Sequence, residues 1–134
     1  GDERPSLYSG HTKDERVLVI EQAVYDRLKV LCAGRVYPDV AKPETQRPYI
    51  TYQQVGGEVV QFIGPDLPSK LNARMMIKVW ANDRLTASDL ARDVEDLMLT
   101  SSLQATAIGS FVSDYEPETE LYGTRQDFSC WINR

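Results

Sequence analysis

In residues 73–98, ARMMIKVWANDRLTASDLARDVEDLM, the apolar residues change from a spacing of two to a spacing of three or four. The first half predicts a strand, whose apolar face consists of Ala73, Met75, Ile77, Val79 and Ala81. The second face of this strand is mixed and consists of Arg74, Met76, Lys78 and Trp80. The second half predicts a helix, whose buried stripe consists of Leu90, Val94, Leu97 and Met98. These two apolar surfaces predict a helix layer packed on a sheet.

The start of this helix carries capping signals. We expect Thr86 to be the N-cap, because Asp89 stands three residues later and Leu85 can pack on Leu90 as a hydrophobic staple. The polar face of the helix carries Asp89, Arg92, Asp93 and Glu95. We interpret this face, including the cluster of Asp93, Glu95 and Asp96, as solvated surface.

The chain before residue 56 predicts a helix and two strands. The helix runs from Glu15 to Leu31 and ends at Ala33-Gly34; its buried stripe is Val17, Ile20, Val24, Leu28 and Leu31. RVYPDV at 35–40 predicts a short strand or extended turn, and AKPETQRP at 41–48 predicts a loop. The β-branched and aromatic run from Tyr49 to Val55 predicts the second strand.

Residues 56–72 connect that strand with the strand that contains Ala73, and together they predict a long hairpin with its tip at Gly64–Pro68. The apolar residues of this connection are our candidate assembly contact: Val59, Val60, Phe62, Ile63 and Leu67. In one interpretation residues 59–63 extend the strand and pack inward. In the other, the tip becomes ordered only against a partner, because apolar side chains on a loop bury area on assembly.

After the second helix, two further strands are expected, from Thr106 to Tyr115 and from Tyr122 to Ile132, with the turn at Asp114–Glu120 between them. The element order is then α-β-β-β-α-β-β. This order predicts an α+β fold, with one antiparallel or mixed sheet and two helices packed on one face. We expect residues 1–14 to form a flexible N-terminal extension and residues 15–134 to form a single α+β domain.

The bulk composition is globular, with 42% hydrophobic and 26% charged residues among 134. The net charge of −5 argues against a partner that is held through many phosphates. The sequence contains no run of 18 apolar residues, so it predicts no membrane-spanning helix. The first residues are too polar for a signal peptide. Cys32 and Cys130 lack CxxC spacing, so we interpret them as buried thiols in a reducing compartment, with a disulfide as the alternative.

Few residues could carry chemistry. The one histidine, His11, lies in the expected extension, so the sequence predicts no Ser-His-Asp or Cys-His pair and no histidine-based zinc site. No glycine-rich phosphate motif is present. A catalytic acid needs burial to raise its pKa, so we interpret the acidic run as solvated surface: Asp114, Glu116, Glu118 and Glu120. We therefore predict no catalytic residue, no metal and no cofactor.

Aromatic residues on the predicted strands could in principle stack on nucleic-acid bases. They are not interleaved with arginine or lysine, so we interpret them as core and sheet packing: Tyr49, Tyr52, Trp80, Tyr115, Tyr122 and Trp131.

Four segments, in this order, resemble one family: RVYP at 35–38, PYITYQ at 48–53, IKVWAND at 77–83 with the helix that follows, and QDFSCW at 126–131. From about Ile20 to Arg134 the chain is similar to the tail-completion proteins of phages and prophages. These are similar to the tail-to-head joining and tail-terminator minor tail proteins of long-tailed, non-contractile phages. The chain departs from the short members in its polar N-terminal extension and its long, apolar hairpin tip.

The resemblance implies a subunit of a ring, a hexamer, at the head-proximal end of the tail tube. Its partners would be further copies of itself, the tail tube protein and the head connector proteins, with DNA only passing through the lumen and no membrane. It implies a virion tail protein that is assembled in the bacterial cytoplasm and has no catalytic residue. Acidic walls would repel the passing phosphates. The alternative is a small non-catalytic adaptor or binding protein of bacterial origin with the same layout.

Overall fold

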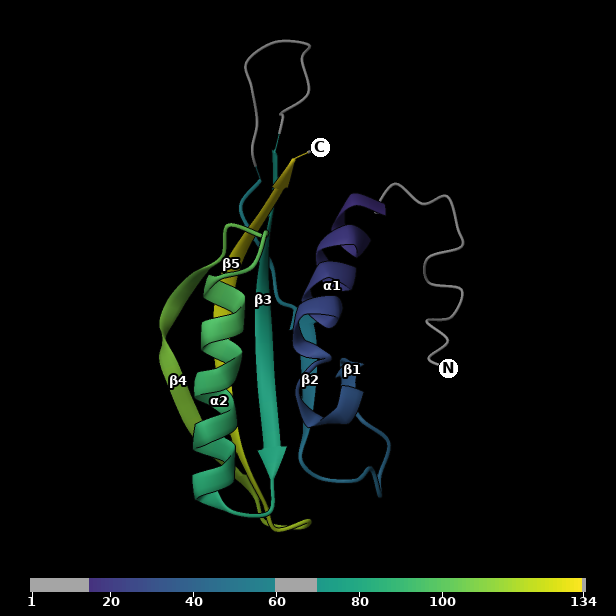
Figure 1. Cartoon of the computed structure of the whole chain (residues 1–134), viewed down its shortest axis with the longest axis vertical. Coiled ribbons are helices and arrows are strands. Elements are labelled where there is room, and N and C mark those ends of the chain that lie inside the picture. Colours follow the sequence, from purple (N-terminus) through teal and green to yellow (C-terminus); the bar gives the residue numbers. More distant parts are fainter. Residues whose placement is uncertain (1–14, 60–69, 134) are drawn as a thin grey trace.

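The computed structural model describes residues 15–59 and 70–133, which form two layers (Figure 1). In chain order the elements are α1 (Glu15–Leu28), the 3-10 turn η2 (Cys32–Gly34), β1 (Val36–Pro38), β2 (Tyr49–Gln54), β3 (Lys70–Ala81), α2 (Arg84–Leu99), β4 (Thr106–Glu116) and β5 (Leu121–Asn133). The strands form one mixed sheet in the order β1-β2-β3-β5-β4, in which β1 is parallel to β2 and the other pairs are antiparallel. The predicted fold class and element order are confirmed.

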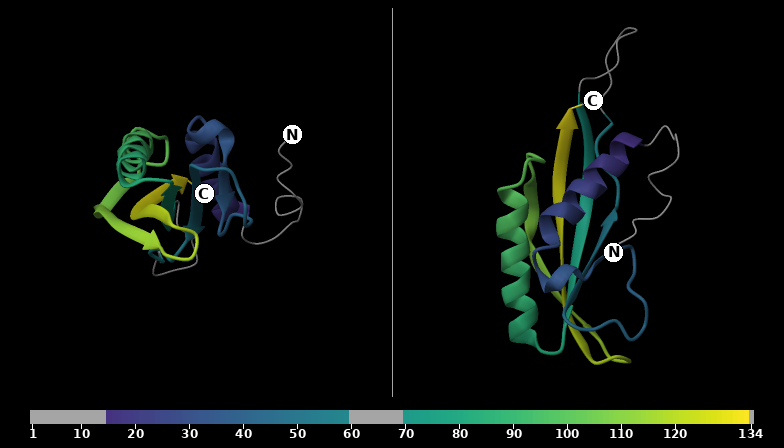
Figure 2. Two further views of the ribbon diagram at one scale, coloured as in Figure 1. Left: turned by 90° about the horizontal axis from the view of Figure 1, so that it is seen from below. Right: turned by 45° about the vertical axis from the view of Figure 1, so that its right-hand side comes forward.

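Both helices lie on the same face of the sheet, as the view from below in Figure 2 shows. The alternation predicted for β3 is confirmed, since its apolar residues are all at most 1% exposed: Ala73, Met75, Ile77, Val79 and Ala81. They form one core with buried residues of both helices and of β5, namely Ile20, Val24, Leu28, Leu90, Val94, Met98, Phe128 and Cys130. Burial of this apolar area is the main stabilising contribution to the fold.

The first helix ends three residues earlier than predicted, at Leu28 rather than Leu31. Lys29 still donates its N–H to the Tyr25 carbonyl at 2.9 Å, but Leu31 donates to the Leu28 carbonyl in a tighter turn. The chain then leaves the helix through Cys32 and Ala33, which adopt positive φ values of 53° and 52°. Leu31 packs at the edge of the core and is only partly buried.

The predicted N-cap of α2 is wrong, because Asp83 and not Thr86 caps this helix. The Asp83 carboxylate accepts the backbone N–H of Thr86 at 2.8 Å and its hydroxyl at 3.0 Å. These bonds lower the pKa of the Asp83 carboxyl. Leu85 is 71% exposed and therefore forms no staple on Leu90. The buried stripe includes Ala87 and Ala91, whereas Leu97 is only partly buried.

The hairpin between β4 and β5 is tighter than predicted, since Asp114–Glu116 belongs to β4 and only residues 117–120 form the turn. The register of β4 against β5 shifts between Ile108 and Val112, where Gly109 adopts a φ of 79°. Such a bulge bends a strand and increases its twist. The N-terminal extension expected at residues 1–14, including His11, lies outside the described residues.

Both cysteines are free, as expected for thiols, and the alternative of a disulfide between them is wrong. Cys130 is buried in the core, whereas Cys32 is only partly buried. Burial raises the pKa of Cys32 to about 11 and that of Cys130 to about 12. Both thiols are therefore protonated at neutral pH, which makes them poor nucleophiles and poor metal ligands.

Candidate assembly surface

The face of the sheet opposite the helices, here called the open face, is covered by no helix of residues 15–59 and 70–133 (Figure 2). β3 contributes its mixed side to this face: Arg74, Met76, Lys78 and Trp80. β5 places Gly123, Arg125 and Asp127 opposite Trp80, Lys78 and Met76. β4 continues the face with Ile108 and Val112, which are 41% and 49% exposed. The open face thus combines aromatic, apolar and cationic groups, and among its residue types tryptophan, methionine and arginine are enriched in protein interfaces.

Trp80 lies across β5 because residue 123 is glycine. A Cβ atom at position 123 would lie 2.6 Å from Cε3 and Cζ3 of Trp80 and 2.9 Å from the Val79 carbonyl oxygen. Carbon atoms in contact are normally about 3.5–4.0 Å apart, so no larger residue fits beneath the ring as it stands. Gly123 therefore fixes the position of Trp80 on the open face.

The charges on the open face are unevenly paired. Arg74 donates to the Asp127 carboxylate at 2.7 Å. Lys78 and Arg125 are register partners on neighbouring strands, and neither forms an ion pair with any side chain in the described part of the chain. Like charges directly opposite each other destabilise a sheet. Because neither cation is neutralised, the centre of this face is positive, although the chain as a whole has a net charge of −5.

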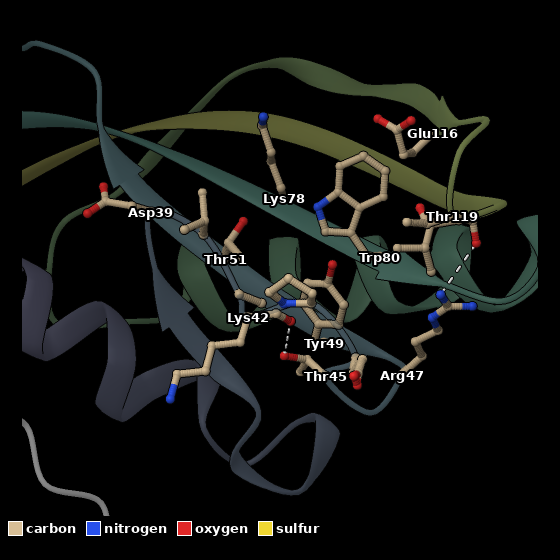
Figure 3. A pocket seen from close by; sticks show the side chains of 15 residues that line it. Asp39, Lys42, Thr45, Arg47, Tyr49, Thr51, Lys78, Trp80, Glu116 and Thr119 are labelled. Carbon is tan, nitrogen blue, oxygen red and sulfur yellow. Dashed lines mark hydrogen bonds between the residues drawn. The ribbon is translucent and has the colours of Figure 1, made fainter.

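A hollow of about 360 Å³ lies at one end of the open face (Figure 3). Thr51, Lys78 and Trp80 line it from the sheet, residues 39–47 form one wall, and Glu116 and Thr119 of the β4–β5 hairpin lie on the opposite side. Arg47 joins the two walls, since its guanidinium donates to Asn82 Oδ1 at 3.0 Å and to the Thr119 carbonyl at 3.4 Å.

The hollow contains no arrangement suited to catalysis. Its carboxylates are divided between the two walls, with Asp39 and Glu44 on one and Glu116 on the other, and the Tyr49 hydroxyl, whose pKa burial raises, stays protonated at neutral pH. Within residues 15–59 and 70–133, no three side chains of histidine, cysteine, aspartate or glutamate are grouped so that they could hold a metal ion. No helix in this part of the chain has the length and apolarity needed to cross a membrane.

The candidate assembly contact lies beyond the end of β2, and the structure describes only its first residue. Backbone pairing with β3 continues to Gly56, whose carbonyl accepts the Arg74 N–H at 2.8 Å. Val59 is 81% exposed, so the interpretation that it packs inward is wrong for this residue. The other members lie outside the described residues, as does the predicted tip at Gly64–Pro68: Val60, Phe62, Ile63 and Leu67.

The acidic groups considered for catalysis are dispersed. Asp93 and Asp96 are exposed on α2, while Glu95 accepts a hydrogen bond from Gln126 Nε2 at 2.8 Å. The run from Asp114 to Glu120 lies at the exposed end of the β4–β5 hairpin. Among the aromatic residues, Tyr52 belongs to the core, and the rings of Tyr115 and Tyr122 are 4.9 Å apart. The interpretation as solvated surface is confirmed for Asp93 and Asp96 but not for Glu95, and the interpretation as packing is confirmed for Tyr52, Tyr115 and Tyr122.

The outer edge of β4 is a further free surface, because β4 pairs only with β5 among the described strands. An unpaired edge offers backbone N–H and C=O groups to another chain. Fold and surface together therefore define a small α+β domain whose sheet has one face covered by helices, one open face and one unpaired edge among the described strands.

The comparisons agree with this class. The family model of the tail completion protein gp17 matches residues 22–133, so the chain belongs to the tail completion protein gp17 family. Its role is that of a structural protein of a phage-type tail. A search of curated protein sequences found no match.

Two solved structures share the fold. A protein in the virion of a native gene transfer agent particle is 17% identical to this chain, with a TM-score of 0.57. The match covers 86% of this chain and 95% of the virion protein's chain. Another solved structure is 10% identical with a TM-score of 0.58, covering 93% of this chain and 97% of its own.

Sequence reasoning missed the open face as a site. The signal was present, because the mixed side of β3 already placed Lys78 and Trp80 together. It did not show that Arg125 and Gly123 lie opposite them, since that pairing depends on which strand neighbours β3.

Proposed function

We propose that the chain forms a ring, a hexamer, that caps the tail tube at its head-proximal end and joins the tail to the head. The observation that carries this proposal is the match to the tail completion family over residues 22–133, nearly the whole of the described fold. The ring would stop growth of the polymerised tube and present a surface to the head connector.

Three features of the subunit support assembly. The open face, the unpaired edge of β4 and the exposed Val59 lie on different parts of the surface. Contacts between unlike surfaces of identical subunits are heterologous, and they close into rings when the rotation between neighbours permits. We propose that Val59, Val60, Phe62, Ile63 and Leu67 form a further contact, with a neighbouring subunit or with the tail tube.

The partners that we propose are further copies of the chain, the tail tube protein and the head connector proteins. DNA would only pass through the lumen, and the net charge of −5 is consistent with a wall that does not hold phosphate. Membrane contact and catalysis form no part of this role. The protein would be located in the virion tail after assembly in the bacterial cytoplasm.

Electron microscopy tests the proposal directly. Negative-stain images of the protein alone at high concentration, and of the protein mixed with tail tubes of the same phage, should show rings or capped tube ends. Monomers in dilute solution are compatible with the proposal, because the tube can act as a template. Images with neither rings nor bound tube ends at high concentration would refute it.

A further inference from the structure

We propose that neighbouring copies join by packing the outer surface of α2 of one copy onto the open face of the next. This inference rests on the proposed ring, and it assigns the two surfaces that form the contact.

The outer surface of α2 carries a regular stripe, here called the outer stripe: Leu85, Asp89, Arg92, Asp96 and Leu99. The spacing alternates between four and three residues, which places these side chains along one line of a helix. All are exposed, and the line lies opposite the buried stripe that contains Val94. Leu85 and Leu99, at the two ends, are 71% and 45% exposed.

The charge of the outer surface of α2 is negative. Arg92 is satisfied within the stripe, because it pairs with Asp89 at 3.6 Å. Asp96, and Asp93 beside the stripe, are exposed and form no ion pair within residues 15–59 and 70–133. Two free carboxylates therefore lie between two exposed leucines.

The open face has the complementary pattern. Its free cations, Lys78 and Arg125, lie directly opposite each other on β3 and β5. Trp80 lies on one side of them, and Val112 of β4 is the register neighbour of Arg125. A carboxylate placed between the two cations would replace their repulsion with two attractions, and the leucines would bury area against the apolar groups.

The arrangement of the layers makes this contact propagate. The outer surface of α2 and the open face lie on opposite sides of the subunit (Figure 2). A copy that offers α2 to one neighbour therefore still offers its open face to another. Such a contact is heterologous, as a ring requires.

Charge reversal in the full chain tests the contact. Asp96→Lys and Arg125→Glu should each raise the protein concentration at half-assembly by at least about tenfold, measured by sedimentation velocity and confirmed by images of the rings. The double variant carries both changes, so every contact regains one charge of each sign. It should assemble within about threefold of the wild type. Glu118→Lys, in the turn between β4 and β5, is the matched control and should assemble like the wild type.

Thermal melts of each variant as a monomer separate loss of contact from loss of fold. Neither reversal should lower the melting temperature, because both positions are exposed and Arg125→Glu replaces the repulsion from Lys78 with an attraction. Rings that tolerate both single reversals, or a double variant that assembles no better than either single one, would overturn this contact while leaving the proposed function intact. Reversals that spare the rings but abolish tube binding would assign the open face to the tail tube protein. This result would also overturn the proposed contact between copies. Failure of the wild type to form rings, both alone at high concentration and on tube ends, would overturn both proposals.

Discussion

Gly123→Ala tests whether the contact between β5 and Trp80 is as close as the structure has it. The new Cβ would lie 2.6 Å from two carbons of the indole ring and 2.9 Å from the Val79 carbonyl oxygen. Since contacting carbons need about 3.5–4.0 Å, the ring must move by about 1 Å. Overpacking of this kind costs about 1–3 kcal/mol in the free energy of unfolding. The residue has no positive φ, so backbone strain adds nothing to the expected cost.

A double-mutant cycle with Trp80→Ala isolates the cause. Without the indole ring the two closest contacts are gone, but the Val79 carbonyl oxygen still lies 2.9 Å from the new Cβ, so Gly123→Ala should lose only part of its cost. The coupling between the two changes should therefore be about 1–2 kcal/mol, measured by reversible urea unfolding followed by circular dichroism. Costs that add within about 0.3–0.5 kcal/mol would show that the ring does not lie over residue 123, and the described open face would be wrong.

Three further predictions concern the core, the cap and the hairpin. Met98→Ala should lower the free energy of unfolding, measured in urea, by about 2–5 kcal/mol, because Met98 is fully buried. Leu97→Ala should lower it clearly less, because Leu97 is only partly buried. Equal losses would mean that α2 is rotated about its axis. The pKa of Asp83 is lowered by folding, so its stabilising contribution is present above its unfolded pKa, roughly 3.9, and is lost as the pH falls through the folded value. Asp83→Asn cannot titrate, so the stability difference between wild type and variant should shrink in acid melts, and a constant difference would contradict the assignment. Phe62→Ser with Ile63→Ser should leave the monomer melt unchanged and abolish tail capping; unfolding would place these side chains in the core, and normal capping would exclude them from the contact.

Periodicity was enough to predict the two-layered core. Every residue on the predicted apolar face of β3 is buried, because a strand in a sheet with one covered face must alternate. The stripe of α2 was predicted less well. Ala87 and Ala91 are buried although their small side chains contribute little to an apolar pattern, and they lie on the Met98 side of the stripe, whereas Leu97 lies on its other flank.

The helix ends and the open face could not be predicted in the same way. Asp83 and Thr86 are both residues that favour the N-cap, and the structure shows that the cap uses both, with the aspartate accepting and the threonine donating. On the open face, Lys78 and Arg125 are 47 positions apart in the sequence, so only the pairing of β3 with β5 brings them together. Local patterns carry no information about such a pairing.

The open face is easier to explain as part of an assembly than as part of a monomer. In the monomer, the repulsion between Lys78 and Arg125 is unfavourable. An acidic residue at either position would have removed it. The same strands do pair Arg74 with Asp127 at 2.7 Å, so the sheet accommodates opposite charges without difficulty. An uncompensated pair beside a compensated one indicates that the compensating charge comes from elsewhere. In a ring built from one kind of subunit, the exposed carboxylates of α2 are one source of that charge in the described part of the chain, and the paired reversal of Asp96 and Arg125 tests this source against the others.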